Sequence, residues 1–111
     1  MPEWLSELLK NICAEGNFTS GMEAVHALSG RSPEHLARSF RKYLGTTPTD
    51  YVNGLRLNYI RNMLVDTDLG VADIGAMAGF NSVSHMNHLF LKAYQMPPSE
   101  YRRRHRKVVI P

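Results

Sequence analysis

The sequence predicts an all-α protein of about seven helices, with two helix-turn-helix subdomains joined by a long linker helix. Three observations support this prediction. Capping residues stand before apolar residues at helical spacing, the alternation that marks a strand is absent, and residues 32–51 share a pattern with residues 82–101. The composition, 43% hydrophobic and 21% charged over 111 residues, suits one small globular domain or two very small ones.

The internal repeat sets the expected architecture. Upstream, at a separation of 49 positions, Val25 pairs with Ile74 and Gly30 pairs with Gly79. Most other positions differ between the copies, so two units with a shared frame would present different side chains. Residues 50 positions apart are identical at Ser32/Ser82, His35/His85, Phe40/Phe90, Lys42/Lys92, Pro48/Pro98 and Tyr51/Tyr101.

Helix signals in the first copy predict two short helices. Ser20 and Glu23 have the spacing of a capping box, and Gly30 suits the left-handed residue that ends a helix. Ser32 is then expected to cap a second helix that has Pro33 at its first position.

A long helix over residues 47–66, about 25 Å in length, is expected to follow. The second copy predicts a short helix at Val71–Ala78 closed by Gly79, and a helix from Ser82 to Tyr94. Pro97 begins the last helix and cannot supply a capping oxygen, so this helix start should be weaker. The predicted organisation is a first subdomain, a linker helix, a second subdomain and a tail, at residues 1–46, 47–66, 67–106 and 107–111.

The net charge of +3 is unevenly distributed along the chain. Residues 1–30 carry −3, residues 31–60 carry +3 and residues 61–111 carry +3. An acidic start followed by two basic parts indicates a polyanionic partner for one face. The basic segment 102–107 could add nonspecific attraction or be disordered, and partial disorder is the favoured interpretation.

The remaining totals exclude several classes of protein. Cys13, the single cysteine, cannot form an internal disulfide and is expected to be a buried, inert thiol in a reducing cytoplasm. No apolar run approaches the length of a membrane span. We find no nucleophile–base arrangement, glycine-rich phosphate loop or paired carboxylates, so neither catalysis nor a cofactor is expected.

Two short helices joined by a glycine-containing turn describe a helix-turn-helix, whose second helix enters the DNA major groove. The two predicted helix-turn-helix motifs lie in the stretches SGRSPEHLARSFRKYLGTTPTDYVNGLRLNYIRNML and VADIGAMAGFNSVSHMNHLFLKAYQMPPSEYRR. They match a Gly-x-Ser-x-x-x-Leu-x-Arg-x-Phe frame and a Gly-Phe-x-Ser-x-Ser signature. Over roughly residues 4–104 the chain resembles the DNA-binding region of the AraC/XylS family of bacterial transcription regulators. PEWL, ALSGRSPEHLARSFRKYLG and LRLN are similar to regulators of chitobiose or cellobiose operons.

The resemblance implies two rigidly joined readers that enter adjacent major grooves of double-stranded DNA and recognise an asymmetric operator. The expected linker helix, with its flanking units, suits the ~34 Å between successive grooves. Family regulators also carry an N-terminal domain that binds an effector and dimerises, so we expect this chain to be the C-terminal part of a longer regulator. An effector sugar would bind that other domain, and RNA polymerase is an expected partner. Activation and repression are both open.

The resemblance also implies which residues contact DNA. The expected base contacts on the first recognition helix are Glu34, Ala37, Arg38 and Arg41, and those on the second are Val83, Ser84, Asn87 and His88. The expected phosphate contacts are Ser32, Lys42, Thr47, Ser82 and Lys92.

Each assignment has a chemical reason and an alternative. Arg38 can pair bidentately with guanine, or it can be solvated or contact only phosphate. Glu34 can accept from cytosine N4 or complement the helix N-terminus. Val83 suits a thymine methyl group and Asn87 an adenine, whereas His88 could reach a base or a phosphate.

Three departures from the family pattern bear on the second unit. The family usually has Arg at the position of His88, Lys or Arg at that of Leu91, and glycine at that of Gln95. We therefore expect the second unit to make fewer direct contacts with bases and phosphates. His35 and His85 occupy one repeat position beside an apolar residue and are interpreted as packed scaffold residues rather than readers.

A rival hypothesis is a helical protein-interaction module that contacts the transcription machinery, with minor DNA binding. A DNA reader should show affinity that falls steeply with salt and a preference for one sequence over bulk DNA, whereas such a module should show neither.

Overall fold

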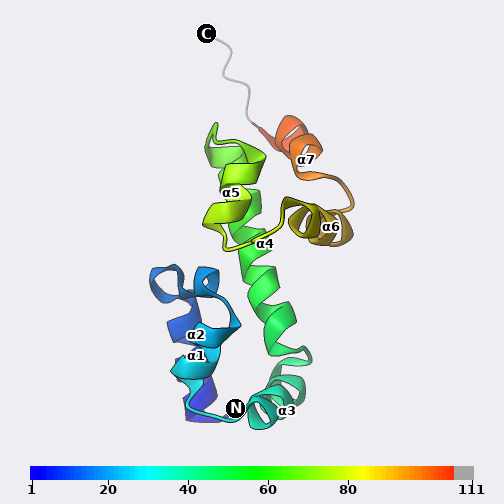
Figure 1. Ribbon diagram of the computed structural model, residues 1–111. Coiled ribbons are helices and arrows are strands. Elements are labelled where there is room, and N and C mark those ends of the chain that lie inside the picture. The colour runs from blue at the N-terminus through cyan, green and yellow to red at the C-terminus, as the bar shows by residue number, and fades with distance from the viewer. Residues whose placement is uncertain (107–111) are drawn as a thin grey trace. The chain divides into compact units, whose positions relative to one another are not determined.

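The computed structural model describes residues 1–106, and within them it contains seven α-helices, one 3₁₀ helix and no strand. This confirms the predicted all-α class and the expected number of helices. None of the described helices is long and apolar enough to cross a membrane. In chain order the helices are α1 Glu3–Cys13, the 3₁₀ helix Ala14–Ser20, α2 Met22–Ser29, α3 Pro33–Leu44, α4 Pro48–Asp66, α5 Val71–Met77, α6 Val83–Tyr94 and α7 Pro98–His105 (Figure 1).

The chain divides into two compact units, one covering Met1–Arg56 and the other beginning at Leu57. The division falls inside α4, so this helix contributes its first half to one unit and its second half to the other. The first unit contains α1, α2, α3 and the start of α4, and the second contains the rest of α4 with α5, α6 and α7.

Each unit has its own apolar core. Apolar and aromatic residues at helical spacing are expected in the cores. Tyr51 and Tyr101 are expected among them but are half-buried and pack against the two cores from outside. The other residues expected there are buried, and they are Leu36, Phe40, Leu57, Ile60, Ile74, Phe80, Met86 and Phe90. The first core consists of Leu5, Leu8, Ile12, Val25, Leu36, Phe40 and Val52. The second consists of Leu57, Ile60, Leu64, Ile74, Ala78, Phe80, Met86 and Phe90.

The internal repeat extends further in the structure than in the sequence comparison. Residues 5, 8 and 12 of α1 fill the first core with the spacing that residues 57, 60 and 64 of α4 use in the second. The second half of α4 is therefore the counterpart of α1, and α7 is the counterpart of the first half of α4. Each unit is a four-helix repeat, and one continuous helix serves both.

The predicted helix starts are confirmed where a side chain supplies the cap. The hydroxyl of Ser32 accepts from the backbone N–H of His35 at 3.2 Å, and that of Ser82 accepts from His85 at 3.1 Å. Each oxygen satisfies one of the amides that a helix leaves unpaired at its N-terminus. Pro97 offers α7 no such bond, as expected.

The predicted start of α2 is wrong. Ser20 is the last residue of the 3₁₀ helix, and Gly21, with φ of 86°, precedes the first residue of α2. No side chain caps α2. A residue inside one helix lacks the extended backbone that an N-cap needs, so Ser20 and Glu23 form no capping box.

Two further expectations are corrected. Cys13 is exposed rather than buried, because Ile12 takes the core position and the next residue of a helix points about 100° away. Arg102, expected in a partly disordered basic tail, belongs to α7 and donates to the carbonyl oxygens of Leu64, Thr67 and Leu69 at 3.0, 3.2 and 2.6 Å. The predicted tail 107–111, with Lys107, lies outside the described residues.

Candidate nucleic-acid interface

The first candidate recognition helix is α3, which follows α2 after a turn at residues 30–32. Gly30 ends α2 with φ of 62°, a left-handed conformation that glycine adopts without steric cost. Leu36 and Phe40 bury one face of α3 completely. The four residues predicted to contact bases share the opposite, exposed face, and they are Glu34, Ala37, Arg38 and Arg41.

Two aromatic contacts hold the start of α3 in place. The ring of His35 meets the ring of Trp4 edge to face, with centroids 5.4 Å apart. The guanidinium of Arg31 lies 4.8 Å from the centroid of the same tryptophan ring. Trp4 thus links α1 to the turn, through Arg31, and to the first turn of α3, through His35. His35 packs as the scaffold residue that its repeat position predicted.

A shallow pocket of about 320 Å³ lies along the exposed side of α3. The ammonium of Lys42 lies 5.1 Å from the centroid of the Tyr43 ring, at the edge of this pocket. Arg38 lines the same pocket, so two cations border one hollow beside the recognition helix. The lining residues are Pro2, Trp4, His35, Arg38, Ser39, Lys42 and Tyr43.

The second candidate recognition helix is α6, which buries Met86 and Phe90 against the second core. His85 is exposed, but its ring lies edge to face with Phe80, with centroids 6.0 Å apart, much as His35 meets Trp4. The four residues predicted to contact bases are again all exposed, and they are Val83, Ser84, Asn87 and His88.

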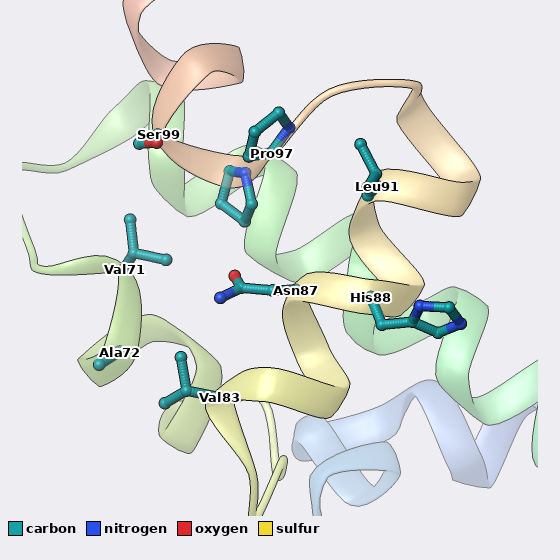
Figure 2. Close-up of a pocket in the computed structure, with 9 residues that line it drawn as sticks. Val71, Ala72, Val83, Asn87, His88, Leu91, Pro97 and Ser99 are labelled. Atoms are coloured by element: carbon teal, nitrogen blue, oxygen red, sulfur yellow. The ribbon is translucent and has the colours of Figure 1, made fainter.

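A groove of about 480 Å³ separates α6 from α5 and from the turn before α7. Figure 2 shows the side chain of Asn87 directed into this groove and the ring of His88 directed away from it. Val71 and Val83 face the groove from its two sides (Figure 2). The groove of the second unit is therefore lined mostly by apolar residues, whereas two cations border the pocket of the first unit.

The residues predicted to contact phosphates occupy helix starts and repeat positions. Lys42 and Lys92 are exposed in the last turns of α3 and α6. The oxygens of Ser32 and Ser82 already accept from their own helices, but each hydroxyl proton is available for a further acceptor. Thr47 is half-buried, and its hydroxyl accepts from the N–H of Asp50 at 3.1 Å.

Among the side chains that the structure describes, no group of three or more potential metal ligands occurs. His85 and His88, three positions apart on α6, have no third histidine, cysteine or carboxylate from that set beside them. The interface described here consists of hydrogen-bonding, cationic and apolar side chains.

Three residues of these surfaces were not among the predicted contact residues. Trp4 and Tyr43 line the pocket beside α3, and Leu91, noted in the sequence only as a departure from the family's Lys or Arg, lines the groove beside α6. Leu91 had a signal in the sequence, since it stands at the repeat position of Arg41. Trp4 had none, because its contact with α3 spans about thirty residues of chain.

Two recognition helices, each preceded by a short helix and a tight turn, define this chain as a double helix-turn-helix DNA-binding domain. A sequence model of the helix-turn-helix domain family matches residues 27–104. The chain belongs to the AraC/XylS family of transcription regulators.

Named relatives and solved structures agree with this assignment. The transcriptional activator NphR of a Rhodococcus species is 39% identical over 84 residues, which cover 76% of this chain and 25% of NphR. The melibiose operon regulatory protein of Escherichia coli K12 is 36% identical over 64 residues, 58% of this chain and 21% of that protein. The chain thus spans about a quarter of the length of several curated relatives, NphR among them.

Two solved structures share the fold. A transcriptional regulator with an AraC-type DNA-binding domain from Chromobacterium violaceum superimposes with a TM-score of 0.79 at 30% identity, covering 92% of this chain and 91% of that one. The DNA-binding domain of AdpA, solved in complex with a target DNA, gives a TM-score of 0.80 at 20% identity, covering 93% of each chain.

Proposed function

We propose that α3 and α6 each read base pairs in a major groove, and that together they recognise an asymmetric operator. One observation carries this proposal. All eight candidate base-contacting residues are exposed, and they lie on two helices whose buried faces are built alike. Because the exposed faces differ, each helix is suited to a different half-site.

On the first helix, Arg38 and Arg41 suit guanine O6 and N7, and Glu34 suits cytosine N4. On the second helix, Asn87 suits adenine, and Ser84 can donate or accept at several base edges. Lys42 and Lys92 supply sequence-independent contacts to phosphates, with Ser32, Ser82 and Thr47 near the helix starts. The first half-site is therefore expected to carry more guanine and cytosine than the second.

The wider role follows from the relatives. We propose a bacterial regulator of sugar-utilisation genes, since the melibiose operon regulatory protein is among the proteins that this chain resembles. In a regulator of the relatives' length, an effector sugar would bind outside these residues. RNA polymerase is the further protein partner, and the protein would act where the bacterial chromosome lies, in the cytoplasm.

A selection from random DNA duplexes tests the two-helix proposal. We expect two enriched blocks of unlike sequence, with centres about 10 base pairs apart. Binding to the selected duplex should weaken steeply with added salt, because Lys and Arg contacts displace counterions. Inserting about five base pairs between the blocks should lower affinity, since it turns one block to the opposite face of the helix.

A single enriched block would show that only one helix reads bases. Equal affinity for all duplexes would instead favour a protein-interaction role. Lys10→Ala is the matched control, because this exposed lysine lies on α1 and should leave the selected sequence unchanged.

A further inference from the structure

A stripe of three residues runs along α6, with Val83, Asn87 and Leu91 at successive intervals of four. Residues four apart on a helix lie one above another on the same face. Val83 and Leu91 are 46% and 49% exposed, so their apolar side chains are open to a partner on this face of α6. All three line the groove of about 480 Å³ (Figure 2).

The equivalent stripe on α3 has a different chemistry. At a separation of 50 positions, Leu91 corresponds to Arg41 and His88 corresponds to Arg38. Lys92 is the one Lys or Arg in α6, whereas α3 contains three such residues. A helix with so little charge depends less on counterion release, so its contribution to binding must come from contacts of another kind.

Apolar groups have one specific target in the DNA major groove, the C5 methyl group of thymine. The partner adenine presents N6 and N7, which a side-chain amide such as that of Asn87 contacts bidentately. One stripe therefore carries an amide for adenine between two apolar groups for neighbouring thymines. Against guanine or cytosine, the same apolar groups would cover polar base edges without offering a hydrogen bond, which costs free energy.

We propose that Leu91 and Val83 read thymine methyl groups, so that the second recognition helix selects A·T base pairs largely through apolar contacts. This inference rests on the proposed function, because it requires α6 to enter a major groove. It adds Leu91 as a specificity-determining residue and names the chemistry of the second half-site.

The test replaces individual thymines by uracil in the duplex that the chain selects from random DNA. This exchange removes one methyl group and leaves base pairing unchanged. At each contacted thymine the dissociation constant should rise about fourfold, the effect of exposing one buried methyl group. Leu91→Ala should abolish this sensitivity at one position and Val83→Ala at another.

Three further variants sharpen the result. Leu91→Met keeps an apolar contact and should keep the sensitivity to uracil. Leu91→Arg, which copies the first helix, should lose that sensitivity and steepen the dependence of log K on log salt by about one. Met77→Ala is the matched control, because this side chain is 48% exposed on α5 but does not line the groove.

The outcomes separate this inference from the proposed function. If base-pair changes in the second half-site weaken binding but uracil does not, the methyl-reading inference is overturned and the two-helix proposal stands. If base-pair changes there have no effect at all, α6 does not read DNA and both proposals fail.

Discussion

The ring of Phe40 meets the ring of Tyr51 edge to face, with centroids 5.7 Å apart and planes inclined by 73°. Phe90 and Tyr101 repeat this contact in the second unit, at 5.7 Å and 86°. Each pair joins a recognition helix to the helix that follows it, α3 to α4 and α6 to α7. Aromatic rings favour this edge-to-face geometry, and the contact holds the buried side of each recognition helix against the next helix.

Replacing Phe40 should therefore destabilise the first unit strongly. Phe40→Ala leaves a cavity at a fully buried position and should lower the free energy of unfolding by about 3–5 kcal/mol. Urea denaturation followed by the fluorescence of Trp4, the one tryptophan of the chain, reports on this unit. The control is Tyr43→Ala, which removes an exposed ring and should change stability by only about 0.5 kcal/mol. Equal effects of both substitutions would contradict the assigned core.

Gln95 ends α6 in the left-handed conformation, with φ of 64°, where the first unit has Gly45 with φ of 68°. A side chain is strained there, since its Cβ approaches the following carbonyl oxygen. Gln95→Gly should relieve this strain and raise the free energy of unfolding by about 0.5–1 kcal/mol. The substitution also removes the exposed hydrogen bond that the Gln95 amide donates to the carbonyl oxygen of Lys92, and this loss reduces the gain. Thermal or urea unfolding measures the change, and a loss of stability would contradict this account.

Gly45 and Gly54 allow the effect of backbone conformation on stability to be measured separately from steric contact. A Cβ added at Gly45 or at Gly54 would meet nothing within 4 Å, so only backbone conformation distinguishes the sites. Gly45→Ala should destabilise by about 1 kcal/mol because its φ is positive. Gly54→Ala, within α4, should stabilise by a similar amount, about 1 kcal/mol, through helix propensity.

Arg38 is expected to specify one base pair. Arg38→Ala should weaken binding to the selected duplex by about 1–3 kcal/mol and relax the preference at one position. A competition assay with the four base pairs at each position measures both effects. An unchanged preference with weaker binding overall would reassign Arg38 to a phosphate.

Lys42 is expected to contact phosphate without regard to sequence. Lys42→Ala should lower affinity for cognate and random duplexes by the same factor and flatten the slope of log K against log salt by about one. Titrations at several salt concentrations provide this slope. Loss of binding at the cognate duplex alone would show that Lys42 reads a base.

Tyr94, which packs against the second core, should make the stability of the protein depend on pH in the alkaline range. Burial raises the pKa of its phenol above the usual 10.0, and Tyr101 adds to this shift while the nearby Arg61 opposes it. The folded state thus favours the neutral phenol, and this stabilisation is present below pH 10 and is lost as pH rises through the higher pKa. Tyr94→Phe should therefore make the decline of stability above pH 10 shallower. Unfolding measured from pH 8 to pH 11 tests this, and an unchanged decline in Tyr94→Phe would contradict it.

Helix starts and buried helix faces could be predicted from the sequence. Ser32 and Ser82, each three residues before the amide it caps, predicted where both recognition helices begin. The spacing of Leu36 with Phe40, and of Met86 with Phe90, predicted their buried faces, whereas the resemblance to the family implied which residues lie on the exposed faces. These features could be predicted because capping and helical periodicity depend on residues within one or two turns.

Contacts between residues far apart in the chain became visible only in the folded molecule. It showed that α1 and the second half of α4 fill the same place in the two units, that Trp4 supports the turn before α3, and that Arg102 binds carbonyl oxygens near the end of α4. It also placed Leu91 of α6 and Val71 of α5 in the lining of one groove. Such contacts join residues far apart in the chain, and no local pattern encodes them, because they depend on how whole helices pack against a shared core.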